Sequence, residues 1–295
     1  MTANETPDEL KRIIDVEEEK DKRIIDFVNK RQKPAVAIIA SYSPRRISPT
    51  RRVFAELGIS EEFGVESLLS MIPTNCKSVL LLLNSMGGAV QSSYMASKAI
   101  RDRFEEINVY VPHSALSGGT LLALTGNKIF MGTMSKLSPL DVQTDYKNTI
   151  VSTNALLRSK AKLDGYFATV DEEDAPYSMR VMADKLDPII MEDWAGIQET
   201  MREYVEEILK MSGYKNVKRV ANKLINELPS HSYVINHERA KKYGLKVALS
   251  TEDAEGWEVM RYWLAKYVTK ATEKHFIRYA CPKAERQKDE SKEKK

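Results

Sequence analysis

Ser117, followed by Gly118 and Gly119, is the serine in this sequence whose surroundings best suit covalent chemistry. An apolar run at 108–111 precedes it and another at 120–124 follows it, which is typical of a strand that leads through a tight turn into a helix. At a helix start, unpaired backbone N–H groups point outward and can bind an anion. Ser117 is therefore a candidate nucleophile; the simpler interpretation is that it only caps the helix.

A second glycine turn lies upstream, where Gly87 and Gly88 follow the apolar run at 79–83. Glycine has no side chain to keep a substrate oxygen away from the backbone. The N–H groups of Gly87, Gly88 and Gly118 could therefore stabilise the oxyanion of a tetrahedral intermediate. Because both turns follow strands, they could face one site, which predicts acyl-transfer chemistry at Ser117.

Several motifs agree in order and spacing with the Clp-type serine peptidases. The sequence most resembles their branch called serine dehydrogenase proteinases, which are related to the signal peptide peptidase SppA. The motifs between about 75 and 145 are N-S-M-G-G, V-Y-V-P, S-A-L-S-G-G-T-L-L-A-L and S-P-L-D-V-Q, and a second patch at 230–247 reads S-H-S-Y-V-I-N-H-E-R-A-K-K-Y-G-L-K-V. The resemblance implies a Clp/crotonase-type βαβ spiral and a serine endopeptidase that needs no cofactor.

A serine hydroxyl needs a general base before it attacks a carbonyl carbon. In the main Clp peptidases this base is a histidine downstream of the serine, but the corresponding region here, 141–143, reads D-V-Q. SppA-like enzymes use a lysine that burial keeps neutral, and that resemblance implies Lys160, with Lys162 as the second choice. Apolar surroundings for this amine could come from Leu156, Leu157 and Leu163.

Other residues remain open for these roles. His231, in the second patch of resemblance, is the alternative base, or else a structural histidine. Asp141 could orient a partner or cap a turn, and we assign it no catalytic role. Ser85 and Ser114 are alternative nucleophiles, although neither is followed by the small residues that let a substrate approach.

Two different functions are also compatible with this fold. A crotonase-type acyl-CoA enzyme would need a carboxylate base near the glycine turns, and the nearest downstream acids, Glu105 and Glu106, lie beyond a helix. A catalytically inactive scaffold would fit the missing downstream histidine. We expect a peptide or protein substrate and a homo-oligomer.

The remaining pattern predicts the elements that would position these residues. Apolar runs at 35–40, 79–83, 108–111 and 128–131 alternate with segments of helical spacing at 63–72 and 89–104. Short connections between them favour βαβ units, a mainly parallel sheet and right-handed crossovers. Sites in such sheets lie at the carboxyl ends of the strands, where both glycine turns fall.

We expect four parts along the chain. They are an N-terminal amphipathic helix in 1–34, a Clp/crotonase-like catalytic domain in 35–250, a C-terminal helix in 251–280 and a disordered charged tail in 281–295. From about 149 the catalytic domain becomes helical. One face of the C-terminal helix would form core or a subunit contact through Trp257, Met260, Trp263 and Tyr267.

Composition excludes several classes of partner. With 295 residues and 42% hydrophobic residues, the chain can form a globular core. Its 45 basic and 42 acidic residues leave a net charge of only +3, so nothing favours nucleic acid. Two distant cysteines, Cys76 and Cys281, indicate a reducing compartment, and we expect a cytoplasmic protein. The aliphatic run 79–83 is too short to span a bilayer, and the N-terminus lacks the pattern of a signal peptide.

Overall fold

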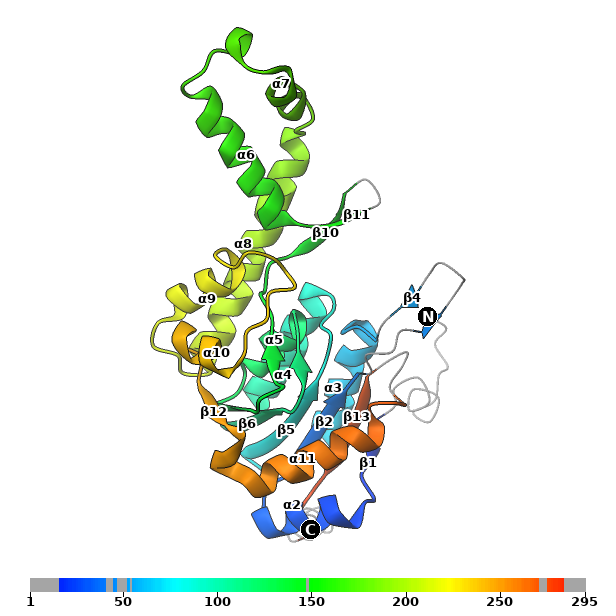
Figure 1. The fold of residues 1–295 in the computed structure, drawn as a ribbon. Helices are drawn as coiled ribbons and strands as arrows, with labels where there is room; N and C mark the ends of the chain where they lie inside the picture. The colour runs from blue at the N-terminus through cyan, green and yellow to red at the C-terminus, as the bar shows by residue number, and fades with distance from the viewer. Residues whose placement is uncertain are drawn as a thin grey trace.

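A seven-stranded sheet forms the centre of the molecule (Figure 1). The computed structural model describes residues 16–40, 45–46, 52–53, 55–146, 149–270 and 275–283. In sheet order the strands are β1 (Val16–Glu18), β13 (Phe276–Ala280), β2 (Ala35–Ile39), β5 (Ser78–Asn84), β6 (Glu106–Val111), β8 (Lys128–Met131) and β12 (Val247–Leu249). Every neighbouring pair is parallel except β13 with β2. The predicted mixed α/β fold with a mainly parallel sheet is confirmed.

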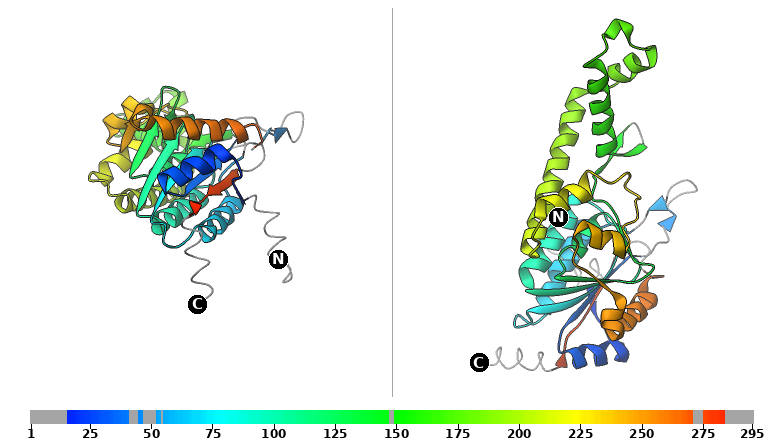
Figure 2. Two further views of the ribbon diagram at one scale, coloured as in Figure 1. Left: turned by 90° about the horizontal axis from the view of Figure 1, so that it is seen from below. Right: turned by 60° about the vertical axis from the view of Figure 1, so that its left-hand side comes forward.

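Helices cover both faces of this sheet. On one face lie α2 (Lys22–Arg31) and α11 (Ala254–Tyr267), which pack together (Figure 2). The core on the other face includes α3 (Ile59–Met71), α4 (Val90–Arg103), α5 (Gly118–Ala123), α8 (Pro188–Met211), α9 (Val217–Ile225) and α10 (His237–Tyr243). The sheet is therefore the middle of three layers.

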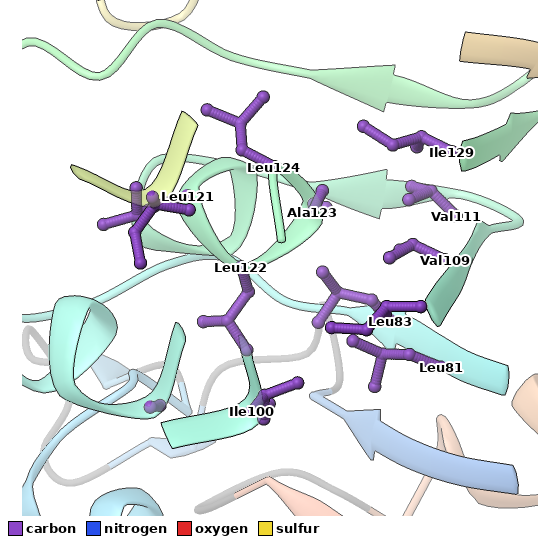
Figure 3. Packing of buried hydrophobic residues seen from close by; sticks show 14 of the residues in the cluster. Leu81, Leu83, Ile100, Val109, Val111, Leu121, Leu122, Ala123, Leu124 and Ile129 are labelled. Carbon is purple, nitrogen blue, oxygen red and sulfur yellow. The ribbon is translucent and has the colours of Figure 1, made fainter. Parts of the chain in front are cut away.

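Strand β5 explains why its sequence reads as a continuous apolar run. Leu81 and Leu83 enter the core that contains α5, whereas Leu80 and Leu82 enter the core that contains α11. Successive side chains of a strand point to opposite faces, so a strand covered on both faces is apolar throughout. Figure 3 shows the first core, in which Leu122 of α5 lies among side chains of the sheet.

An arm extends from the body in Figures 1 and 2. It starts with a hairpin of β10 (Gln143–Tyr146) and β11 (Thr149–Ser152) and continues through α6 (Thr153–Phe167), α7 (Tyr177–Asp184) and the first part of α8. The helical character predicted after 149 is present, but the hairpin was not predicted. Two shorter pairs join β3 (Arg45–Arg46) to β4 (Arg52–Val53) and β7 (Ser114–Ala115) to β9 (Lys136–Leu137).

The terminal elements differ from those predicted. In the N-terminal part, 1–34, residues 1–15 lie outside the described residues, and Val16–Glu18 is strand β1 rather than helix. The predicted C-terminal helix ends at Tyr267, and Phe276–Ala280 instead forms strand β13 between β1 and β2. Pairing on both sides satisfies the backbone groups of β13, a gain that local helical spacing cannot reveal. Of the predicted tail, 284–295 lies outside the described residues.

The apolar face of α11 is part of the core, as predicted. Met260 and Trp263 are fully buried, and the indole N–H of Trp263 donates to Glu19 Oε2 at 2.7 Å. Across the ranges that the structure describes, no helix combines the length and the apolar character that a membrane span needs.

Candidate active site

The first glycine turn follows β5 and packs against the second. Gly87 has φ = 99°, a backbone conformation that favours glycine. A Cβ at Gly87 would lie 2.6 Å from the Cβ of Ser117, and a Cβ at Gly88 would overlap the backbone of Leu57. The glycines therefore allow the turn to approach both Ser117 and the segment before α3.

Ser117 has a strained backbone at the start of α5. Its φ of 49° and ψ of −123° are unusual for a residue with a side chain. Its N–H donates to Ser138 Oγ at 2.6 Å, and its carbonyl accepts the N–H of Thr120 at 2.7 Å. Ser138 is in turn held by Thr120, whose Oγ1 accepts the Ser138 N–H at 3.0 Å. These bonds fix a conformation that a serine alone would not adopt.

The three backbone amides predicted to hold an oxyanion differ in their contacts. The N–H of Gly87 donates to Ser85 Oγ at 3.1 Å. The amides of Gly88 and Gly118 have no hydrogen-bond acceptor among the residues that the structure describes. The Gly118 amide is at the first position of α5, where a helix supplies no internal partner. A Cβ at Gly118 would lie 3.4 Å from the Gly88 nitrogen, so these two free donors are neighbours.

A pocket of about 600 Å³ brings together Ser117 and all three glycines of the two turns. It extends from these turns along Lys136–Asp145 to the segment His231–Val234. Apolar side chains line much of it, including those of Leu137, Leu140, Val142, Met201 and Val234. The sequence prediction that the two turns share one site is therefore consistent with this pocket.

His231 lines the same pocket and contacts Asp141. Its Nδ1 lies 3.0 Å from Asp141 Oδ1 and 3.1 Å from the Asp141 carbonyl oxygen. Asp141 is buried and also accepts the hydroxyl of Ser152 at 2.6 Å. Burial alone would raise the pKa of Asp141, but the hydrogen bonds from His231 and Ser152 outweigh it and hold that pKa below its usual value.

This contact defines the state of the imidazole ring. An ionised carboxylate can only accept, so Nδ1 of His231 carries the proton that Asp141 receives. In the neutral ring Nε2 is then the basic nitrogen. Among the described residues, none makes a hydrogen bond to Ser117 Oγ, so His231 and Ser117 share the pocket without a direct bond.

Lys160 lies on α6, which Figure 1 shows in the arm, and is not among the residues that line this pocket. Its Nζ lies 2.5 Å from Asp164 Oδ2, one helical turn along, and its side chain is 47% exposed. The apolar surroundings predicted for this amine are therefore wrong, because α6 turns Leu163 inward and Lys160 outward. Lys162 is exposed on the same helix.

The alternative nucleophiles Ser85 and Ser114 are both fully buried. Neither side chain can meet a substrate in this conformation. Ser138, which holds the Ser117 amide, and Asp141 both belong to the S-P-L-D-V-Q motif at 138–143, and that motif is the signal that could have drawn attention to them. Nothing in the motif indicates the contact between Ser138 and Ser117.

The chain is similar to one family of known proteins along most of its length. The sequence model of the ClpP-like SDH-type serine proteinases matches residues 22–293. In Methanocaldococcus jannaschii, MJ0137 is 28% identical over 172 residues, covering 58% of this chain and 54% of that protein. MJ1495 of the same organism is 25% identical over 168 residues, covering 57% and 51%. Both are uncharacterised, and the chain spans about half the length of these curated relatives.

Two solved structures are also similar. The 1510-N membrane-bound stomatin-specific protease has a TM-score of 0.44 and 15% identity, covering 68% of this chain and 78% of that one. ClpP1 from Listeria monocytogenes has a TM-score of 0.41 and 11% identity, covering 80% and 98%.

Proposed function

Because the chain belongs to the ClpP-like SDH-type serine proteinase family, we propose that it is a serine peptidase that cleaves peptide bonds through Ser117. The observation that carries the proposal is the strained Ser117 beside the free amides of Gly88 and Gly118 in one pocket. A strained residue among unpartnered donors has a cost in stability that a purely structural turn would avoid.

We propose His231 as the general base. The support is its place on the same pocket and its hydrogen bond to the buried carboxylate of Asp141. That carboxylate would hold the ring in the tautomer whose Nε2 accepts a proton and would stabilise the imidazolium that forms. Because Ser117 and His231 are not directly bonded here, the mechanism requires them to approach when a substrate binds, as catalytic hydrogen bonds often tighten at that stage.

The reaction would proceed by acyl transfer. Ser117 Oγ attacks the peptide carbonyl carbon while its proton passes to His231, and the carbonyl oxygen becomes an oxyanion facing the N–H groups of Gly88 and Gly118. The intermediate expels the amine, which takes the proton from His231, and leaves an acyl ester on Ser117. Water then attacks this ester by the same route, which releases the carboxylic acid and restores the serine.

The Gly87 amide has a different part in this proposal. Since it donates to Ser85 Oγ, it would shape the turn rather than bind the oxyanion.

The pocket's apolar lining, with Leu140 and Met201, favours a substrate with an apolar side chain near the cleaved bond. Cleavage within a chain, as an endopeptidase, remains part of the proposal.

Self-association also remains a proposal. The arm exposes apolar side chains at Tyr177 and Ile189, which are 76% and 80% exposed, and a second copy could cover them. Sedimentation of the pure protein would test this, since a monomer at micromolar concentration would contradict it.

Labelling with a fluorophosphonate probe tests the function. Wild type should be labelled, Ser117→Ala should not, and His231→Gln should be labelled far more slowly. Lys160, the base implied by the sequence resemblance, is the alternative, and loss of labelling in Lys160→Met with normal labelling in His231→Gln would select it. Failure of the probe to label folded wild-type protein would reject a serine peptidase.

A further inference from the structure

A second serine, histidine and carboxylate are aligned behind the glycine turn, outside the pocket. Ser85 Oγ lies 2.8 Å from His275 Nε2. On the other side of the ring, His275 Nδ1 lies 3.5 Å from Glu61 Oε1, and the same oxygen accepts the His275 N–H at 3.3 Å. All three residues are buried: Ser85 is 0% exposed, His275 2% and Glu61 6%.

This row of side chains cannot be a second active site, because no substrate can reach a fully buried Ser85. Its burial still needs an explanation, since desolvating a histidine and a carboxylate is unfavourable unless they are paired. Burial would raise the pKa of Glu61, but hydrogen bonding from His275 and from the Gly58 N–H outweighs it and lowers that pKa. An ionised Glu61 can only accept hydrogen bonds and cannot donate one, so the row has a direction.

That direction ends on the glycine turn. His275 Nδ1 makes no hydrogen bond among the described residues, and the nearby carboxylate oxygen of Glu61, at 3.5 Å, is an electrostatic contact only. That negative charge favours the proton on Nδ1, so Nε2 is the nitrogen that accepts the hydroxyl proton of Ser85. The lone pairs of Ser85 Oγ are then free for the N–H of Gly87, which donates to it at 3.1 Å. Glu61 thus orients His275, His275 orients the Ser85 hydroxyl, and that hydroxyl fixes the Gly87 amide.

The opposite side of the turn is attached to the same glutamate. Glu61 Oε2 accepts the N–H of Gly58 at 3.0 Å, and Leu57, directly before Gly58, bridges the turn. The Leu57 N–H donates to the Gly87 carbonyl at 2.7 Å, and the Leu57 carbonyl accepts the Ala89 N–H at 2.8 Å. Both flanks of Gly88 are therefore tied to one buried carboxylate.

Given the peptidase mechanism proposed above, on which this inference rests, we propose that Glu61, His275 and Ser85 form a positioning chain that aims the Gly88 N–H at the oxyanion. These residues touch neither substrate nor reacting atoms. They act through the backbone on both sides of Gly88: Ser85 holds the Gly87 N–H, and Glu61 holds Gly58 next to Leu57. Removing an oxyanion donor costs about 10²–10³ in rate, so a misaimed donor should cost about tenfold or more.

The test compares Ser85→Ala, His275→Leu and the double variant by their second-order rates of fluorophosphonate labelling. Each single variant should be labelled about tenfold more slowly than wild type. The double variant should be labelled no more slowly than either single variant, because both residues act in series on the same amide and their effects do not add. His275→Gln, whose amide can still accept the Ser85 hydroxyl, should recover part of the rate. Ser97→Ala is the matched control, since it removes a buried hydroxyl whose one hydrogen bond to the described residues goes to the helix carbonyl of Ser93.

Hydrogen exchange of the 85–89 amides gives a readout independent of activity and of global stability. It should accelerate in Ser85→Ala and His275→Leu and not in Ser97→Ala, measured on protein whose unfolding transition confirms the fold. If wild type is labelled, two results would overturn the inference. One is a labelling rate in the single variants within about twofold of wild type, and the other is a double variant whose rate loss is the product of the two single losses. If wild type is not labelled but the 85–89 amides still exchange faster in Ser85→Ala and His275→Leu, the proposed function is rejected. The role of these residues in anchoring the turn would then still be supported.

Discussion

The hydroxyl of Ser138 accepts the backbone N–H of Ser117 at 2.6 Å and so holds the proposed nucleophile in a backbone conformation with positive φ. A serine in that region costs on the order of 1–3 kcal/mol unless its surroundings enforce it. The N–H bond and the Thr120 contact to the Ser117 carbonyl supply that enforcement. The backbone geometry of Ser117, the proposed nucleophile, therefore depends on a residue outside the sequence motif that contains Ser117.

Replacing Ser138 with alanine should slow labelling of Ser117. Loss of one hydrogen bond is worth about 1 kcal/mol, and we expect the labelling rate to fall by about fivefold. Ser135→Ala is the matched control, because Ser135 also accepts a backbone N–H, that of Gly132 at 2.7 Å, and lies outside the pocket lining. Equal rates for the two variants would show that Ser138 does not hold the nucleophile.

Gly118→Ala should impair both stability and labelling. The added Cβ would overlap the buried hydroxyl of Ser93, and overpacking of this kind costs about 1–3 kcal/mol. Gly165→Ala is the control, since a Cβ there meets nothing within 4 Å and alanine in a helix stabilises by roughly 0.5–1 kcal/mol. Urea unfolding measures the stability of both variants, and fluorophosphonate labelling measures the effect at Ser117. A Gly118→Ala variant as stable as wild type would contradict the close packing of α4 against α5.

Asp141→Asn should have a pH-dependent effect on stability. The pKa of Asp141 is lowered because hydrogen bonds from His231 and Ser152 outweigh the opposing effect of burial. A lowered pKa in the folded state adds stability above the ordinary pKa of the group, and that stability is lost as the pH falls through the lowered value. At about pH 7 we expect the variant to lose about 1–3 kcal/mol in the free energy of unfolding.

Urea unfolding across a pH series checks this expectation. The difference between wild type and Asp141→Asn should shrink as the solution is acidified below the ordinary carboxyl range, about pH 4. The exposed Asp26→Asn should change stability little at any pH. A difference that grew in acid would contradict the direction of the Asp141 shift.

Lys160→Met and Lys162→Met should both leave labelling of Ser117 close to the wild-type rate if His231 is the base. Both lysines are exposed on α6, and the Lys160–Asp164 pair is a solvated contact within one helix. Such pairs contribute roughly 0.3–0.5 kcal/mol, so thermal unfolding should change little. Loss of labelling in Lys160→Met alone would identify Lys160 as the base.

The sequence by itself determined four strands of the central sheet, β2, β5, β6 and β8, together with the glycine turns and their common edge of the sheet. Local patterns suffice there, because a strand covered on both faces is apolar throughout, as β5 is, and parallel strands bring their carboxyl ends to one edge. This is why the residue pattern alone could group Ser117 with Gly87, Gly88 and Gly118, which line one pocket.

Only the tertiary structure decided what surrounds that edge. His231 and Asp141 are 90 residues apart, and His275 reaches Ser85 because β13 inserts between β1 and β2. Pairings over such distances follow from strand insertion and loop closure, which leave no local period in the sequence. The orientation of Lys160 could not be predicted from the sequence either. The pattern of an amphipathic helix indicates which residues share a face, but not which element that face will pack against.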